Sequence, residues 1–366
     1  MKIRCEKNIF LKGVQTVQNI VSARAALPIL SNILLETQKK SLYLAGTDLD
    51  VGIATSIEAE IEEEGAITLP AKRLGDVIKE LPEEECVLST KKNNMVTLEC
   101  GKCFFRLPGL SKDDFPKFPI FENEPKFILP QEVLKTMLRM TSFAMSHDET
   151  RYVLNGILFE VNEKSLVLVA TDGRRLAYIE KALETGRREP YAMIIPTKTI
   201  HELNRLLQEA GEVKLIKKEN QVLFDLGETS ILSRLIDGEF PNYEQVIPKE
   251  TRDEKIRVNR EQFLQATRRA SLLTSQESQS IKLDLLKDKV VVSKISAEAG
   301  EAREEVEAEY KGKELTIGFN PNYIIDGLKN ISEPDIAFEL EGPEKPGVIR
   351  TKDHYIYIVL PMQISS

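Results

Sequence analysis

The sequence predicts an α+β protein built from three similar units in tandem, and three observations lead to this prediction. A short strand, a proline and an amphipathic segment recur together, with Pro70, Pro196 and Pro321 at intervals of 126 and 125 residues. Runs such as SLYLAGTDLDVGIAT (41–55) alternate apolar and polar residues with a period of two, which is typical of antiparallel strands with one solvated face. Each repeat holds only two helical segments, too few for a doubly wound parallel sheet.

Each unit opens with a strand that turns directly into a helix. The three openings are IRCEKNIFLKGVQTVQNI (3–20), FILPQEVLKTMLRMTSFA (127–144) and IRVNREQFLQATRRASLL (256–273). A strand, a Thr-Asp turn and a second strand are written twice, as LYLAGTDLDVGIAT (42–55) and LVLVATDGRRLAYIE (166–180). The second helix of each unit lies in ITLPAKRLGDVIKELP (67–82), MIIPTKTIHELNRLLQ (193–208) and LTIGFNPNYIIDGLKNI (315–331). A duplicated chain carries its flanking elements at the same offset, as these segments do.

The coarse outline of one unit is therefore β-α-β-β-β-β-α-β-β-β. Helices are predicted over 6–24, 72–80, 131–145, 198–209, 260–273 and 321–331. Domains are predicted over 1–122, 123–250 and 251–366, joined by short proline-bearing linkers at 115–127 and 240–255.

Composition favours a soluble cytoplasmic protein. None of the apolar runs in the 366 residues reaches the ~20 residues of a membrane helix, and MKIRCEKNIF does not resemble a secretory signal. The four cysteines form no spaced disulfide framework. Cys100 and Cys103 make a CxxC, for which half a zinc site and a redox pair are the alternatives. Gly101 and Lys102 lie between two strand-like runs, so a hairpin turn is the favoured interpretation.

Charge is distributed unevenly along the chain. The net charge is −8, yet the six predicted helices hold fourteen basic and eight acidic residues, a net +6 that leaves −14 elsewhere. Lys and Arg are good helix formers, so solvated helix faces are one explanation. The other is that the helices face an anionic partner such as nucleic acid, which the acidic remainder repels.

No catalytic constellation is found in the sequence. The three histidines, His147, His201 and His354, fall at unrelated places in the repeats, and neither a GxxxxGK[ST] nor a GxGxxG motif occurs. Asp48 and Asp50 are conceivable metal ligands of a hydrolase together with Asp172, but an Asp that caps its own turn is favoured. The sequence therefore predicts a binding protein rather than an enzyme, with no cofactor and no metal.

Motifs spread over the whole chain resemble those of one family. ALPILSNILLE (26–36), GTDLDVGI (46–53), RYVLNGILFE (151–160), VATDGRRLA (169–177), DGEFPNYEQVIP (237–248), IGFNPNYIIDGL (317–328) and YIYIVLPMQ (355–363) are similar to the bacterial sliding clamp, the beta subunit of DNA polymerase III. The resemblance implies a head-to-tail homodimer of DNA-clamp domains. Its six domains would form a ring around duplex DNA, helices lining the pore, and would tether the polymerase. A rigid repeat scaffold that binds only proteins is the alternative.

The resemblance also implies three sets of site residues. The DNA-facing set is Arg24, Lys72, Arg73, His147, Tyr152 and Lys198. The ring interface pairs Phe105 and Leu107 with Leu272 and Leu273, with intradomain core as the alternative for all four, and Lys72 and Arg73 would add ion pairs to Glu301, Glu304 and Glu305.

The third set is a cleft for short extended peptides from the polymerase III catalytic subunit, clamp-loader subunits and other polymerases and repair proteins. It comprises Leu154, Thr171, Gly173, Arg174, Arg175, Leu176, Pro241, Val246, Asn320, Tyr323, Ile358, Val359, Leu360, Pro361 and Met362. Two features depart from the family pattern: Asp148 stands where an amide side chain is common, and no basic residue follows Met362.

Overall fold

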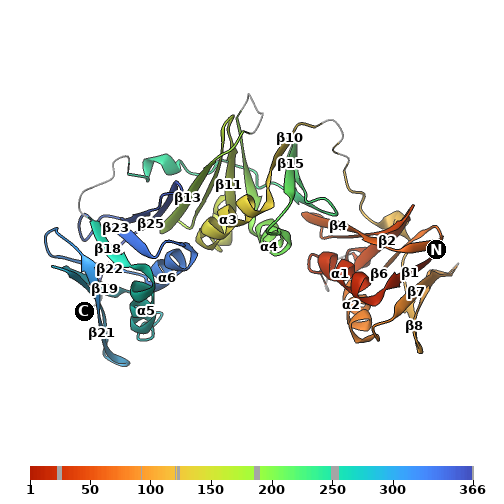
Figure 1. Ribbon diagram of the computed structural model, residues 1–366, viewed down its shortest axis with the longest axis horizontal. Coiled ribbons are helices and arrows are strands. Elements are labelled where there is room, and N and C mark those ends of the chain that lie inside the picture. Colours follow the sequence, from red (N-terminus) through yellow and green to blue (C-terminus); the bar gives the residue numbers. More distant parts are fainter. Residues whose placement is uncertain are drawn as a thin grey trace. The chain divides into compact units, whose positions relative to one another are not determined.

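The structure is a computed structural model that describes residues 1–22, 27–91, 93–119, 121, 124–184, 190–248 and 255–364. The chain divides into two compact units. The first comprises Met1–Leu134 and His201–Leu235, and the second comprises Lys135–Ile200 and Ile236–Ser366. Figure 1 shows that both consist of antiparallel sheets flanked by helices.

The first unit holds two sheets. The five-stranded sheet has the order β5-β1-β7-β8-β9. Its strands are β1 (Lys2–Glu6), β5 (Glu60–Glu63), β7 (Glu85–Thr90), β8 (Met95–Cys100) and β9 (Cys103–Pro108). The eight-stranded sheet has the order β10-β15-β16-β17-β4-β3-β2-β6. Its strands are β2 (Asn32–Gln38), β3 (Ser41–Thr47), β4 (Val51–Glu58), β6 (Ala66–Pro70), β10 (Lys126–Pro130), β15 (Glu212–Lys218), β16 (Gln221–Asp225) and β17 (Thr229–Arg234).

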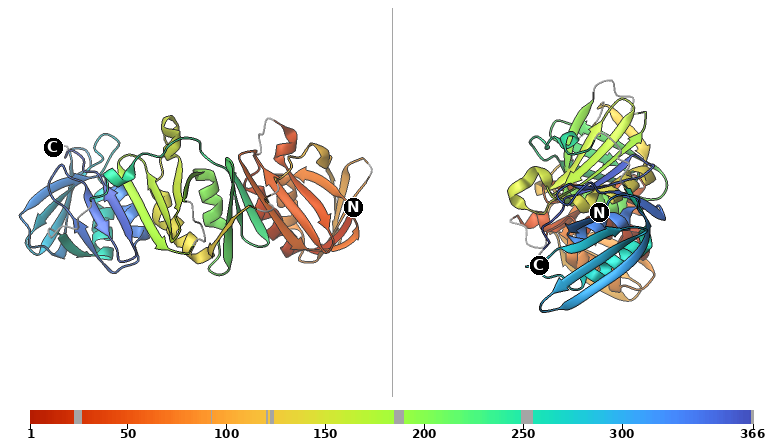
Figure 2. Two further views of the ribbon diagram at one scale, coloured as in Figure 1. Left: turned by 90° about the horizontal axis from the view of Figure 1, so that it is seen from above. Right: turned by 90° about the vertical axis from the view of Figure 1, so that its left-hand side faces the viewer.

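The second unit holds one continuous sheet of twelve strands, in the order β14-β11-β12-β13-β25-β24-β23-β18-β21-β20-β19-β22. Its strands are β11 (Gly156–Val161), β12 (Ser165–Thr171), β13 (Arg175–Ala182), β14 (Tyr191–Pro196), β18 (Lys255–Asn259), β19 (Ile281–Leu286), β20 (Lys289–Ser296), β21 (Gly300–Glu309), β22 (Leu315–Phe319), β23 (Asp335–Glu339), β24 (Gly347–Arg350) and β25 (Tyr355–Val359). The blue strands of its C-terminal part are twisted in Figure 2, as expected for L-residues.

Six α-helices occur in the described residues. They are α1 (Lys7–Gln18), α2 (Ala71–Glu80), α3 (Gln131–Thr141), α4 (Thr197–Leu206), α5 (Arg260–Ser271) and α6 (Pro321–Asn330). Helix α1 packs on α2 and on strands β3 and β4, and α5 packs on α6. Their apolar residues recur every three or four positions, so one face of each helix is buried against a sheet.

The predicted threefold repeat is confirmed by the element order. The second and third repeats follow β-α-β-β-β-β-α-β-β-β, and the first departs from it only by the additional strand β5. That strand has the sequence EIEE, in which Ile61 is the single apolar residue, so its pattern did not indicate a strand. Five of the six helices are shorter than predicted, whereas α2 begins one residue earlier than predicted, at Ala71. Helix α3 ends at Thr141 and continues as a separate 3-10 turn, Ser142–Ala144, because Thr141 has left helical geometry.

The second helix of each repeat begins directly at or after the repeated proline. Pro70 and Pro196 are the last residues of strands β6 and β14, and Pro321 is the first residue of α6. Proline is tolerated there because the first N–H groups of a helix have no partner within the helix. In the third repeat Asn320 supplies the cap, since its side chain accepts a hydrogen bond from the Asn322 N–H at 3.0 Å.

Candidate functional site

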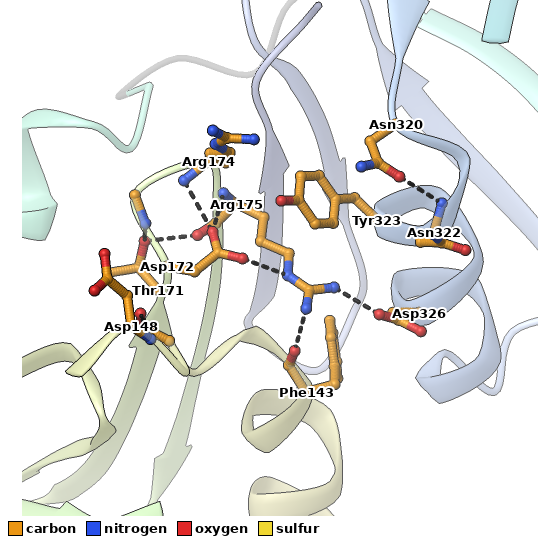
Figure 3. Close-up of polar contacts among 12 residues, drawn as sticks. Phe143, Asp148, Thr171, Asp172, Arg174, Arg175, Asn320, Asn322, Tyr323 and Asp326 are labelled. Carbon is orange, nitrogen blue, oxygen red and sulfur yellow. Dashed lines mark hydrogen bonds and ion pairs between the residues drawn. The ribbon is translucent and has the colours of Figure 1, made fainter. Parts of the chain in front are cut away.

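Arg175 is the centre of a polar cluster in the second unit. It begins strand β13, and its side chain is only 10% exposed. Its Nε donates to Asp172 Oδ2 at 3.1 Å, its Nη1 to Asp326 Oδ2 at 2.7 Å, and its Nη2 to the carbonyl oxygen of Phe143. Figure 3 shows the guanidinium between these three groups. One side chain thus joins the turn before β13, helix α6 and the 3-10 turn after α3.

Aromatic rings cover the guanidinium of Arg175. Its Cζ lies 4.6 Å from the ring centroid of Tyr323 and 5.6 Å from that of Phe143. The Phe143 ring also meets Tyr357 edge-on at 5.4 Å, and the Tyr357 hydroxyl donates to the Tyr323 carbonyl at 2.8 Å. Burial alone would lower the pKa of Arg175, but Tyr357, Asp326 and Asp172 raise it above its usual value. The cation is therefore permanent and fixed in orientation.

The turn that precedes Arg175 is held by the two residues predicted to form it. Asp172 Oδ1 accepts hydrogen bonds from the N–H groups of Arg174 at 2.9 Å and Arg175 at 3.0 Å. Thr171 Oγ1 accepts from the Gly173 N–H at 3.0 Å and donates to the Arg175 carbonyl at 2.6 Å. Gly173 has φ +83°, which glycine adopts without the steric strain of a side chain.

The matching turn in the first unit has the same hydrogen bonds. Asp48 Oδ1 accepts from the N–H groups of Asp50 and Val51, at 3.1 and 2.8 Å. Thr47 Oγ1 accepts from the Leu49 N–H and donates to the Val51 carbonyl, and Leu49 has φ +82°. The prediction that Asp48 and Asp172 cap their turns is confirmed.

The prediction that the CxxC forms a hairpin turn is also confirmed, because Cys100 and Cys103 are paired across the turn.

The C-terminal residues pack against the turn that precedes Arg175. Strands β13 and β25 are paired, with Leu176 opposite Ile358. Beyond β25, the Leu360 N–H donates to the Arg174 carbonyl at 2.9 Å, and the Met362 N–H donates to the Gly318 carbonyl at 2.8 Å. Residues from β13, β25 and the segment after β25 therefore form one continuous surface.

An apolar cluster underlies that surface. Leu176 and Ile358 belong to it together with Leu158, Val167, Val169, Ile194, Tyr243 and Val348. The half-buried side chains packed on it are Val153, Tyr178, Ile236, Phe240, Ile247 and Ile356. Because Leu176, Ile358 and Val359 are almost completely buried, they support the surface more than they line it. Exposed apolar area comes from Val246 and Leu360.

The predicted cleft residues come from five segments, which differ in how closely they contact Arg175 and the apolar cluster. Tyr323 covers the guanidinium of Arg175, and Thr171, Gly173 and Arg174 belong to the turn that precedes it. Leu154 is buried next to Val153 of the apolar cluster, and Val246 follows Tyr243 of that cluster. Asn320 is buried as the cap of α6, and Pro361 is half-buried beside Met362. Pro241 is exposed in the segment between Phe240 and Tyr243.

The predicted interface residues lie in different environments. Phe105 lines a pocket of about 840 Å³ with Lys72, Arg73 and Val77. Leu107 is 5% exposed and belongs to the core of its own domain, so the alternative considered for it holds. Leu272 is 78% exposed and Leu273 is half-buried, directly after helix α5.

Two of the three acidic residues predicted to face Lys72 and Arg73 already have partners in the chain. Glu304 is bonded by Arg269 at 2.7 Å, and Glu305 by Lys289 and Arg303, both at 2.8 Å. Ion pairs from Lys72 and Arg73 to these carboxylates would therefore have to compete with these existing pairs.

The predicted DNA-facing residues are exposed wherever they are described. Lys72 and Arg73 are exposed on α2, Lys198 on α4, and His147 and Tyr152 in the segment after α3. Arg24 lies outside the described residues. With the observed limits, the six helices hold thirteen basic and six acidic residues, a net +7 in a chain of net −8. Hydrogen bonds from Thr150 hold the pKa of Asp148 below its usual range. Asp148, which replaces the amide side chain common in the family beside His147, is therefore anionic.

Comparison with known proteins places the whole chain in one family. The profile for the DNA polymerase III beta subunit, N-terminal domain, matches residues 1–119, that for the central domain matches 128–242, and that for the C-terminal domain matches 244–363. The chain belongs to the DNA polymerase III beta-subunit family. The three predicted clamp domains are thereby confirmed as such, while their limits at 122 and 250 remain predictions.

Three relatives illustrate the similarity. The beta sliding clamp of Pseudomonas aeruginosa is 34% identical over 368 residues, covering all of both chains. The crystal structure of the Bacillus subtilis sliding clamp is 31% identical with a TM-score of 0.94, and covers all of both chains. The Bartonella birtlesii sliding clamp bound to griselimycin is 34% identical with a TM-score of 0.93, again over the full length of both. The function that this family membership supports is that of a sliding clamp.

Three residues of the Arg175 cluster were missed by sequence reasoning. Phe143, Asp326 and Tyr357 interact with Arg175, but their own neighbours in the sequence are ordinary helix and strand residues. In the part of the chain that is described, no group of three His, Cys, Asp or Glu side chains is arranged to hold a metal ion. Among the same residues, no helix has the length and hydrophobicity needed to cross a membrane.

Proposed function

We propose that two copies of this sliding clamp close head to tail into a ring around duplex DNA in the cytoplasm, and that the Arg175 surface binds the peptides of client proteins. The clamp itself would catalyse no reaction. The observation that carries the DNA part is the net +7 on six helices of an acidic chain. Phosphate attraction of this kind is independent of sequence, as a protein that slides requires.

Two strand edges support the ring. Strand β9 ends its sheet and is paired along its length only with β8. Residues 300–307 of β21 are paired with β20 on one side, while β18 meets only the last residues of β21. An open edge offers unpaired N–H and C=O groups to another strand. The β21 edge is rich in Glu and β9 carries Arg106, so the two edges are complementary in charge.

The apolar part of the ring contact would pair the Phe105 pocket of one chain with Leu272 and Leu273 of the other. Leu272 is so exposed in one chain that a change there should not disturb the fold. Leu272→Asp would place a charge in an apolar contact, which costs about 1–3 kcal/mol or more per buried unpaired polar group.

Solution mass tests the ring. One chain is 41.4 kDa, so a dimer should have twice this mass. We expect Leu272→Asp to shift the mass toward the monomer, while Leu49→Asp, at another exposed leucine, leaves the dimer intact. A dimer that survives Leu272→Asp would contradict this interface.

Retention on DNA tests encirclement. A loaded ring should stay on closed circular DNA and slide off a linear fragment of the same sequence. Equal retention on both would favour binding without encirclement, and no retention on either would favour the alternative of a rigid scaffold for proteins only.

The client surface combines a fixed cation, exposed apolar side chains and an adaptable methionine. Leu360 and Val246 supply apolar area, and Met362 can adjust to different anchors. Such a surface suits a short extended peptide with one or two Leu or Phe anchors. The clients proposed from the family resemblance are the polymerase III catalytic subunit, clamp-loader subunits and other polymerases and repair proteins.

Competition between peptides tests the client site. Tail peptides of two different polymerases should displace each other from the intact dimer, because both would occupy the same surface. Arg174→Ala changes an exposed side chain of that surface and should alter affinity without altering the dimer mass. Simultaneous binding of both peptides would contradict a single shared site.

A further inference from the structure

Four cysteine thiols form a row across the five-stranded sheet. The register places Cys5 of β1 opposite Cys86 of β7, Cys86 opposite Cys100 of β8, and Cys100 opposite Cys103 of β9. Residues directly opposite each other in antiparallel strands project to the same face. Cys5, Cys86 and Cys100 are buried, Cys103 is half-buried, and all four are free thiols. The separate cysteines of the sequence thus become one cluster whose outer member reaches solvent.

The pair Cys86 and Cys100 has the geometry that a cross-strand disulfide needs. Further along β7 and β8, the Lys91 N–H donates to the Met95 carbonyl at 2.9 Å, so Lys91 and Met95 are a hydrogen-bonded pair. Hydrogen-bonded and non-hydrogen-bonded pairs alternate along an antiparallel ladder. Cys86 and Cys100 fall on the intervening, non-hydrogen-bonded positions. There the Cα atoms are ~4.5 Å apart and the Cβ atoms closer than in the other pairs, within the ~4.4–6.8 Å of disulfides.

The pair Cys100 and Cys103 occupies the other kind of position. The Gly109 N–H donates to the Asn94 carbonyl at 2.9 Å, so Asn94 and Gly109 are a hydrogen-bonded pair of the β8–β9 ladder. Cys100 and Cys103 lie an even number of positions from this pair along the two strands, and are therefore of the same kind. These two cysteines are thus a hydrogen-bonded pair that closes the turn at Gly101, with Cα atoms ~5.5 Å apart. This Cα separation also lies within the range of disulfides, but it is wider than that of a non-hydrogen-bonded pair.

We propose that Cys86, Cys100 and Cys103 form a thiol–disulfide site that reacts with low-molecular-weight disulfides and ends as a Cys86–Cys100 disulfide. The Cys103 thiolate attacks the small disulfide, forms a mixed disulfide and releases one small thiolate. The Cys100 thiolate then attacks the Cys103 sulfur and releases the second small thiolate. The Cys86 thiolate attacks the Cys100 sulfur and returns Cys103 to its reduced form.

The reaction is balanced in electrons and protons. Two thiols of the chain lose their protons and are oxidised to one disulfide, and the small disulfide is reduced to two thiols. Cys103 must react first because it is the half-buried member. Burial raises the pKa of Cys86 to about 12, so the last step should be the slowest at neutral pH.

Oxidised glutathione is the probe that tests the site on the folded full-length dimer. Free thiols are alkylated after the incubation, and peptides are mapped without reduction. We expect a Cys86–Cys100 link, the loss of two free thiols per chain, and no lasting adduct on Cys103. Glutathione retained on Cys103 of the unsubstituted chain, or thiols that react only after unfolding in urea, would overturn the proposal.

Three variants identify the steps. Cys103→Ser should slow formation of the Cys86–Cys100 link by about tenfold or more, because both remaining thiols are buried. Cys86→Ser should stop the exchange at the Cys100–Cys103 disulfide or the Cys103 adduct. Cys5→Ser is the matched control, since Cys5 lies in the same row but outside the exchanging set. It should leave the rate unchanged, and a Cys5-containing disulfide would contradict the order of the row. Where a Ser variant fails to fold, as judged by circular dichroism, the Ala variant replaces it.

The site would also protect the ring contact, a consequence that rests on the proposed function. Cys103 and Phe105 lie two residues apart on β9 and project to the same face, so an adduct on Cys103 stands beside the proposed contact. Cys100→Ser should retain the adduct and weaken the glutathione-treated dimer. An adduct that leaves the dimer mass unchanged would overturn this link to the ring, whereas peptide mapping judges the thiol exchange by itself.

Discussion

Arg175→Ala should destabilise the second unit by about 3 kcal/mol, because one side chain satisfies three acceptors. Hydrogen bonds that involve charged groups contribute ~1.5–3 kcal/mol each, and removal of one partner from a buried ion pair costs ~3–5 kcal/mol. Two features reduce the sum. Asp172 keeps the backbone N–H groups of Arg174 and Arg175, and the Asp326 side chain is 34% exposed and can be hydrated.

Thermal unfolding followed by circular dichroism measures this loss. For a unit of 150–250 residues, ~3 kcal/mol corresponds to a melting temperature lower by about 6–12 °C. The control is Arg174→Ala, at the neighbouring arginine whose side chain is exposed and points away from the cluster in Figure 3. It should change stability by no more than ~0.5 kcal/mol.

Asp326→Asn separates charge from packing. It keeps the shape of the acceptor but removes its charge, so its cost should be smaller than that of Arg175→Ala. A melting temperature of Arg175→Ala within about 1 °C of that of the unsubstituted protein would refute this prediction. The contacts of Arg175 would then contribute less than ~0.5 kcal/mol to stability. A loss of stability equal in Arg174→Ala and Arg175→Ala would also refute it, because only one of the two is buried.

The other predictions concern DNA, pH and the C-terminus. Lys72→Ala should weaken DNA binding equally on all sequences and reduce the slope of log affinity against log salt by about 0.9 per lost phosphate contact; a sequence-selective loss would contradict this. Burial raises the pKa of the Cys5 and Cys86 thiols from 9.0 to about 12, so stability is complete below pH 9 and is lost as the pH rises toward 12. Urea midpoints measured across that range should fall less steeply for Cys86→Ala, and an unchanged slope counts against buried ionisation. Deletion of residues 361–366 should abolish binding of a polymerase tail peptide with the dimer mass intact, and undiminished peptide binding would refute the client site.

Sequence periodicity was sufficient for the repeat because the same physical constraints recur in each unit. A strand that ends in proline and a helix with one apolar face must appear wherever a sheet is covered by a helix. Strand β5 was not predicted because EIEE has no alternation of apolar and polar residues. Its pairing with β1 is seen only in the structure. The end of α3 was predicted too late because apolar residues continue beyond it, where Ala144 and Met145 are buried but lie outside the α-helix.

The candidate site was predicted only in part because its polar contacts join distant segments. Arg175 was identified from a motif, but its partners Asp326 and Phe143 lie 151 and 32 residues away. No local pattern distinguishes a carboxylate that faces a guanidinium from one that faces water. Leu107 shows the converse limit, since the family resemblance assigned it with Phe105 to the ring interface, whereas the structure places it in the core of its own domain.

The two Thr-Asp turns show how one backbone geometry can present either a core side chain or a polar one. In each turn the Thr hydroxyl and the Asp carboxylate make four hydrogen bonds with backbone groups, and the third residue adopts a positive φ in both. The backbone groups of the fifth residue bond the Thr hydroxyl and the Asp carboxylate in both turns, so its own side chain is free to differ. It is Val51 in the first unit, where it is buried at the start of β4, and Arg175 in the second. There the free oxygen of Asp172 accepts the guanidinium, and the arginine reaches helix α6 of the next repeat. The same turn geometry therefore carries a buried apolar side chain in one unit, and in the other a guanidinium that bonds the helix of the next repeat.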